Sequence, residues 1–290
     1  MNNAIPFKYS PEWVRFKTAV QKTLVHVALV CVSIMFVYPL IRIFSVSLRP
    51  DDILNSASLA LVPDGATLVS YGKLLTQTHF LRWLWNSLLI TGVTSIIGVS
   101  LASTAGYAFS RFKFPGNKLG LTVLLSTQMI PAGMLLLPMF LMIMKMGLVN
   151  TYLGMIIAYS VSSLPFSIWI LKGYYDTVPR SLEEAALVDG TTQFGAFYRI
   201  VLPLSTPALA IAFLFNFTAA WNEYLVARVI LADSSRYTWT LGLFELQGQF
   251  ITQWGMFAAG SILVTIPVLC VFLYSSKWLV SGLTLGSVKG

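Results

Sequence analysis

Six long stretches of this 290-residue chain contain no Asp, Glu, Lys or Arg. A helix needs about 20 apolar residues to cross the roughly 30 Å hydrocarbon core of a bilayer, and each stretch is long enough for one such helix. Backbone groups in hydrocarbon must be hydrogen-bonded within the protein, and the stretches lack the alternation of barrel strands. The predicted fold class is an all-α membrane protein with six transmembrane helices, near residues 22–47, 85–110, 119–145, 152–174, 203–227 and 257–280.

The composition agrees with a membrane location and excludes a soluble domain. Hydrophobic residues make up 56% of the chain and charged residues only 10%, whereas soluble domains average about 25% charged residues. The net charge of +8, taken alone, is compatible with nucleic-acid binding. Membrane proteins also gather Lys and Arg on their cytoplasmic side, however, so we expect no nucleic-acid partner and interpret the charge as a membrane signal.

The distribution of positive charge predicts an orientation. Six spans place both termini on one side, and that side carries most of the 19 Lys and Arg residues, including three in the short loop 111–118. Both termini are therefore predicted to be cytoplasmic. The expected divisions are a cytoplasmic segment 1–21, a six-span domain 22–280 and a cytoplasmic tail 281–290. The first span follows a long basic segment without a convincing cleavage site, so we expect a retained anchor.

The spans offer few groups that could carry out chemistry. No two carboxylates share a span, and the motifs of zinc proteases, serine hydrolases and P-loop NTPases are missing from the sequence. An enzyme is therefore disfavoured. A secondary carrier is also disfavoured, because ion-driven carriers usually keep ionisable residues at membrane depth. Cys31 and Cys270 fall inside expected spans, which argues against a disulfide or a cysteine-based metal site. No metal or cofactor is expected.

One polar loop, SLEEAALVDGTTQFGAFYRIVLP (181–203), interrupts the apolar sequence on the predicted cytoplasmic side. Ser181 is a suitable helix N-cap that Glu184 could complete as a capping box. Gly190 is suited to a left-handed residue after a helix, and Thr191 or Thr192 can cap a second helix. We expect two short helices joined by a glycine turn, with these apolar residues on the second: Phe194, Phe197, Tyr198, Val201 and Leu202. The hairpin is equally compatible with an amphipathic element lying on the membrane and with a docking surface for a soluble partner.

The spacing of this loop resembles the EAA loop of ATP-binding cassette (ABC) importer permeases: EAA, three residues, G, nine residues, then I-x-LP. The matching positions are Glu184, Ala185, Ala186, Gly190, Ile200, Leu202 and Pro203, and Asp189 fits the common DG form. Other segments resemble the carbohydrate-uptake branch, among them YAFSRFKFPG (107–116) and AAWNEYL (219–225). The C-terminal GLTLGSVKG and QGQFITQWGMFAAGSILVTIPVL (247–269) are most similar to the smaller membrane subunit of maltose/maltodextrin importers.

The resemblance implies a non-catalytic transport subunit in a bacterial inner membrane. Its implied partners are a homologous second permease, two ATP-binding subunits and an extracytoplasmic sugar-binding protein. The loop 177–202 would then couple the spans to the ATPase, with Glu184 contacting basic groups and the small Ala185 and Ala186 allowing close approach. The implied ATPase-coupling residues are Glu183, Glu184, Ala185, Ala186, Asp189, Gly190, Ile200, Leu202 and Pro203. Ser287, Lys289 and Gly290 in the tail would make a second contact.

The cargo is less constrained by the sequence than the subunit type. Maltose or maltodextrin is favoured, and trehalose, another glycoside and glycerol phosphate stay open as alternatives. Sugars are bound by aromatic and neutral hydrogen-bonding side chains, which gives a candidate substrate path: Gln128, Asn216, Trp221, Asn222, Glu223 and Tyr224. For any one of them, ordinary packing is the more common explanation. The outward segment FELQGQFITQW (244–254) is expected to meet the binding protein.

Overall fold

The computed structural model describes residues 11–50, 60, 62–248 and 252–286, and this part of the chain contains helices and turns but no strand. The prediction of an all-helical chain is therefore confirmed for the described residues. The elements are α1 (Pro11–Ser47), α2 (Val69–Gln77), α3 (Phe80–Arg111), α4 (Asn117–Thr127), α5 (Ala132–Lys145), α6 (Tyr152–Thr177), α7 (Arg180–Val188), α8 (Gln193–Ala196), the π-helix η1 (Phe197–Val201), α9 (Leu202–Leu204), α10 (Thr206–Trp221), α11 (Leu225–Ile230), the 3-10 helix η2 (Ser234–Arg236), α12 (Trp239–Glu245) and α13 (Trp254–Gly286).

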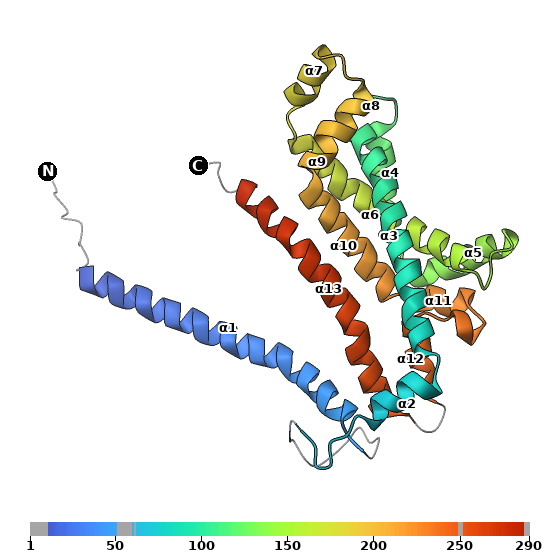
Figure 1. The fold of residues 1–290 in the computed structure, drawn as a ribbon. Helices are drawn as coiled ribbons and strands as arrows, with labels where there is room; N and C mark the ends of the chain where they lie inside the picture. The colour runs from blue at the N-terminus through green and yellow to red at the C-terminus, as the bar shows by residue number, and fades with distance from the viewer. Residues whose placement is uncertain (1–10, 51–59, 61, 249–251, 287–290) are drawn as a thin grey trace.

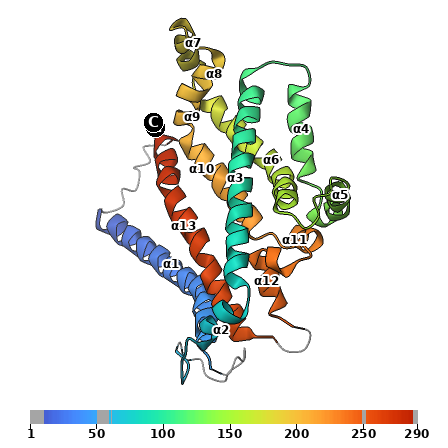
Figure 2. The ribbon, with the colours of Figure 1, turned by 45° about the vertical axis from the view of Figure 1, so that its right-hand side comes forward.

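Three long helices form the centre of the molecule. α3 packs along α6 and α10, and α13 packs along the other side of α10 (Figure 1). α1 meets α13 near α2 and then diverges from it, which is visible in both views (Figure 2). All residues from 16 to 40 in α1 are exposed. This helix therefore packs on the bundle mainly through its last turns, where Ser45, Val46 and Ser47 are buried.

Four helices are long and apolar enough to cross a membrane, and the number rises to six if two bent helix pairs each count as one span. The first bent pair is α4 and α5, whose axes meet at 103°. The third expected span, 119–145, is thus broken into two helices, and it is one span only if the bent pair crosses the membrane together. Pro131 lies at the start of α5 and has no N–H to donate, so the regular helix cannot continue through this position.

The second bent pair joins the segment Gln193–Leu204 to α10 at 77°. Pro203 and Pro207 lie on either side of the bend, and neither can donate a backbone hydrogen bond. Immediately before it the helix widens to a π-turn, in which the N–H of Leu202 donates to the carbonyl of Phe197. α10 then ends at Trp221. The fifth expected span, 203–227, is therefore three helices rather than one.

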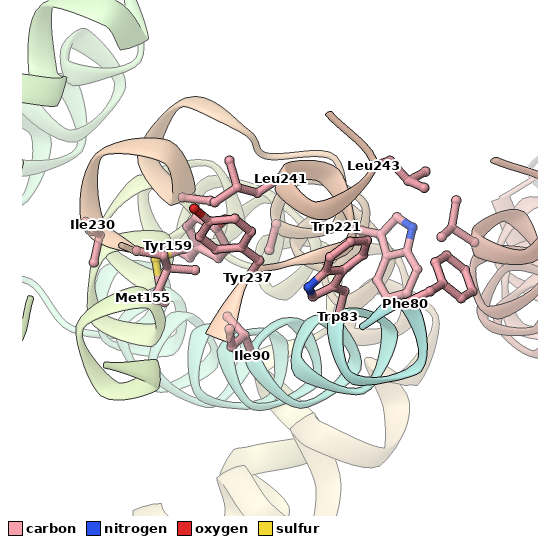
Figure 3. Packing of buried hydrophobic residues seen from close by; sticks show 14 of the residues in the cluster. Phe80, Trp83, Ile90, Met155, Tyr159, Trp221, Ile230, Tyr237, Leu241 and Leu243 are labelled. Carbon is pink, nitrogen blue, oxygen red and sulfur yellow. The ribbon is translucent and has the colours of Figure 1, made fainter. Parts of the chain in front are cut away.

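Two clusters of buried apolar residues hold the helices together. The larger cluster includes Trp83, Tyr159, Trp221 and Tyr237, contributed by α3, α6, α10 and the segment before α12 (Figure 3). The smaller cluster lies toward α7 and α8 and includes Tyr107, Tyr175, Phe197 and Val201. The two clusters lie at opposite ends of α3, so this helix spans the full height of the packed bundle.

Polar side chains fix the α2-facing end of α3. The indole N–H of Trp83 donates to the carbonyl of Ser234 at 2.8 Å. The side-chain amide of Asn86 donates to the carbonyls of Ser235 and Tyr237, each at 3.0 Å, and the Tyr152 hydroxyl donates to its oxygen. The connection between α11 and α12 is therefore tied to the first turns of α3.

Candidate functional site

The segment between α6 and α10 folds as two short helices, α7 and α8, that project beyond the rest of the bundle (Figure 1). We call residues 180–196 the α7–α8 hairpin. Gly190 follows α7 with a φ of +86°, a conformation that glycine adopts without strain. The N–H of Thr191 donates to the carbonyl of Ala186 at 2.9 Å, and that of Gly190 to Leu187 at 3.1 Å. This is the Schellman pattern, so the predicted glycine turn is confirmed.

The predicted N-cap of α8 is confirmed, and the predicted N-cap of α7 is wrong. Thr192 caps α8, because its hydroxyl oxygen accepts the N–H of Gly195 at 3.1 Å. The expected capping box of Ser181 and Glu184 is wrong: α7 begins one residue earlier, at Arg180, and its first turn has no side-chain cap. Because Ser181 already lies inside the helix, its hydroxyl cannot take the N-cap position.

Two adjacent carboxylates on α7 have opposite environments. Glu183 is buried, and it accepts the Tyr107 hydroxyl at 2.7 Å and the Arg111 Nε–H at 2.6 Å. Glu184 is exposed. Successive residues point about 100° apart around a helix of 3.6 residues per turn, so one carboxylate faces the bundle and its neighbour faces away. Of the two glutamates expected to meet a partner, only Glu184 is available.

The outer face of the hairpin is mixed apolar and acidic. We call the exposed residues there the hairpin surface: Leu182, Glu184, Leu187, Val188 and Phe194. Val188 is 87% exposed and Phe194 is 65% exposed, which is unusual for large apolar side chains unless another surface covers them. Ala185 and Asp189 are exposed beside these residues, and Ala186 is half-buried.

The last part of the loop attaches the hairpin to the bundle. Phe197 and Val201 are buried, and the Phe197 ring lies 4.5 Å from the Tyr107 ring between centroids. Ile200 is half-buried, Leu202 packs against the smaller cluster, and Pro203 is exposed next to the bend. Ser287, Lys289 and Gly290, the expected tail contact, lie outside the described residues.

The residues of the candidate substrate path do not converge on one cleft. Trp221 is buried and stacks on Phe217, with centroids 5.4 Å apart. Glu223 is engaged by the protein itself, because its carboxylate accepts the Tyr159 hydroxyl and the N–H groups of Val226 and Ala227. That carboxylate therefore holds the start of α11 rather than pointing into an open path.

The remaining path candidates are spread over three places. Asn216 is 2% exposed; its oxygen accepts from Ser167, and its Nδ2 has no hydrogen-bond partner among the described residues. Tyr224 packs on Phe244, and Asn222 is exposed. Gln128 lines a cavity of about 380 Å³ at the bend between α4 and α5. Gln128 and Asn222 are thus the candidates most open to a ligand.

Sequence reasoning missed Arg111 and Tyr107 as functional residues. Both belong to the segment YAFSRFKFPG, and they lie 72 and 76 residues before Glu183 in the chain. A lone arginine at the end of an apolar stretch looks like an ordinary membrane-boundary residue. The only available signal was the presence of a glutamate one position before the EAA triplet, which has no partner within its own helix.

Comparison with known proteins identifies the family. The family model described as "Binding-protein-dependent transport system inner membrane component" matches residues 95–280. The maltose/maltodextrin transport system permease protein MalG of Vibrio vulnificus (strain YJ016) is 36% identical over 284 residues, covering 91% of this chain and 95% of that protein. MalG of Salmonella typhimurium is 37% identical, and MalG of Escherichia coli (strain K12) is 35% identical, over the same length.

Solved structures show the same fold. A chain of a bacterial ABC transporter involved in the import of the acidic polysaccharide alginate superposes with a TM-score of 0.77 and 23% identity, covering 94% of this chain and 99% of that one. A chain from the alginate transporter in complex with a pentasaccharide-bound periplasmic protein gives a TM-score of 0.61. The family model and the MalG relatives confirm the predicted resemblance to importer permeases. They also confirm the expectation of a transport subunit rather than an enzyme. This chain belongs to the family of binding-protein-dependent transport system inner membrane components.

Proposed function

We propose that this chain is a permease subunit of an ATP-driven sugar importer in a bacterial inner membrane, with maltose or maltodextrin as the cargo. The sugar assignment is supported by the relatives that are named for maltose/maltodextrin transport and that match 91% of this chain. The subunit forms part of the translocation path and has no catalytic residues of its own. ATP hydrolysis belongs to a separate pair of subunits.

The hairpin surface is the observation that carries this proposal. It stands clear of the bundle, its apolar side chains are uncovered, and Glu184 and Asp189 give it an acidic rim. A soluble subunit with a complementary apolar and basic cleft would bury this face and neutralise its carboxylates. We assign that role to the ATPase. The hairpin side of the molecule is then cytoplasmic, in agreement with the predicted orientation.

Two further partners complete the proposed assembly. α1 is exposed over residues 16–40, and a homologous second permease would cover part of this apolar length. A sugar-loaded binding protein would dock at the opposite end from the hairpin, near α12; residues 249–251 of the expected docking segment 244–254 lie outside the described residues. The alginate transporter structure that contains a periplasmic protein supports such a partner. Coupling requires that the ATPase favours different hairpin positions in its ATP-bound and ATP-free states.

The direct test is reconstitution of the chain with its candidate second permease, ATPase and binding protein. Hydrolysis should be stimulated most by binding protein loaded with maltodextrins, and less by trehalose, other glycosides or glycerol phosphate. A stimulated response to one of the other ligands would reassign the cargo and leave the subunit role intact. Sugar uptake that proceeds without ATP would contradict the role itself.

The same preparation tests the docking surface. Glu184→Lys should reduce copurification of the ATPase, because it reverses the charge of an exposed carboxylate on the hairpin surface. The matched control is Glu245→Lys, which reverses an exposed carboxylate on α12 and should leave ATPase binding unchanged. Equal ATPase recovery with Glu184→Lys and with the control would show that the ATPase docks elsewhere.

A further inference from the structure

Glu183 joins the hairpin to α3 through buried charged groups, and it is not part of the exposed hairpin surface. The Glu183 and Arg111 side chains are 6% and 4% exposed, and their ion pair measures 2.6 Å. We propose that Glu183 and Arg111 form a positioning contact that passes movement of α7 into α3. This inference deepens the proposed function and rests on it, because it assumes that the ATPase moves the hairpin.

Arg111 connects three parts of the structure at once. Its Nε–H donates to Glu183 on α7, its Nη1 donates to the Ser110 hydroxyl on α3 at 3.0 Å, and its Nη2 donates to the Val178 carbonyl at 2.9 Å. Val178 lies in the connection from α6 to α7. A guanidinium is a rigid planar fork, so these bonds fix the relative positions of their acceptors more strictly than a lysine could.

Further bonds at the same place hold the hairpin in one rotation. The Tyr107 hydroxyl donates to the second carboxylate oxygen of Glu183 at 2.7 Å. From the hairpin side, Arg180 donates to the Ser110 carbonyl at 2.9 Å. Hydrogen bonds weaken steeply when their angle is lost, so α7 cannot turn about its axis or lift from α3 without breaking several of them together.

The end of α3 is also bound to the end of α6. The Ser110 hydroxyl donates to Asp176 at 2.7 Å, and Lys172 pairs with the same carboxylate. α3 and α6 also pack against each other along their length. A displacement of Arg111 should therefore move both helices together.

α3 is suited to carry such a displacement across the molecule. It is one continuous helix of 32 residues, which corresponds to about 48 Å. Its other end is bonded through Trp83 and Asn86 to the connection between α11 and α12. The alternative route from the hairpin along the chain passes through a π-turn and a 77° bend before α10, where movement can be absorbed. The ion pair bypasses that bend.

The test compares Glu183→Gln, Arg111→Gln and the double variant in the reconstituted transporter. The readouts are ATPase copurification, thermal stability, and the ratio of hydrolysis with and without sugar-loaded binding protein. The matched control is Lys118→Gln, which neutralises an exposed basic residue in the first turn of α4, at the same end of the bundle. Exposed charges contribute little to stability, so this variant should behave like the wild type.

Each single variant should still copurify with the ATPase, whereas the stimulation ratio should fall to about one. The double variant should recover thermal stability, because it leaves no unpaired buried charge, and it should stay unstimulated. Stimulation that returns together with stability in the double variant would show a merely structural pair and overturn the inference. So would a normal ratio in either single variant. A wild-type chain that does not bind the ATPase would instead overturn the proposed function, and the inference with it.

Discussion

At the scale of single residues, two adjacent glutamates of the hairpin have different roles: one attaches the hairpin to the bundle, and the next is exposed for a partner. Glu183 is held by Tyr107 and Arg111 inside the protein, and Glu184 is exposed on the hairpin surface. Burying a carboxylate is costly unless it is hydrogen-bonded, and each oxygen of Glu183 accepts a hydrogen bond. The two neighbouring glutamates are therefore not interchangeable, although the sequence presents them as a pair.

Gly190 should be required for its backbone conformation alone. Its φ is +86°, and a Cβ atom added there would meet no atom within 4 Å, so the obstacle to a side chain is the backbone conformation rather than a clash at Cβ. Gly190→Val should strain the turn by about 1–3 kcal/mol and abolish sugar uptake. Gly190→Asn should retain uptake, because asparagine tolerates the left-handed region. The check is transport by the two variants at matched expression; uptake by the valine variant at the wild-type rate would contradict a conformational role.

At the scale of elements, α12 packs so closely against α3 at Gly242 that no side chain fits at this position. A Cβ atom at Gly242 would lie 2.1 Å from the Trp83 ring (Figure 3 shows Trp83 in this cluster). The ring is itself fixed by its bond to the Ser234 carbonyl. The glycine thus allows the indole to pack directly on the backbone of α12.

Gly242→Ala should therefore destabilise the protein by about 1–3 kcal/mol, the usual cost of overpacking a core. The expected result is a lower midpoint of thermal unfolding in detergent, accompanied by a change in tryptophan fluorescence as the Trp83 environment opens. The control is Gly72→Ala in α2, where an added Cβ meets nothing within 4 Å. If both variants unfold at the same temperature, the Trp83 contact does not limit stability.

The elements also show what a sequence can and cannot reveal. Gly190 and Thr192 were predictable because turns and caps depend on adjacent residues. Pro131 signalled an interruption, but nothing local sets the 103° angle between α4 and α5, which depends on what the two helices pack against. The Glu183–Arg111 pair was out of reach, since its partners are brought together only when α3 and α6 have packed.

At the scale of the whole molecule, α1 is exposed along most of its length, over residues 16–40. It carries the free cysteine Cys31 on its exposed surface. In a Cys270→Ser background, Cys31 should react readily with a lipid-soluble maleimide when the chain is expressed alone. Coexpression of the second permease should slow this reaction, because the partner is proposed to cover α1. An unchanged labelling rate in the assembled complex would place the partner against a different face.

The break between α4 and α5 has a consequence for what surrounds the protein. Over Gln128–Pro131 the backbone leaves the helix, and nearby Met129 and Met134 are largely exposed. Carbonyl groups freed from a helix are not stable against lipid tails, so if α4 and α5 together make one span, this side of it does not face hydrocarbon. It needs another protein chain or a column of water against it. The bend therefore marks a part of the subunit surface that lipid does not cover.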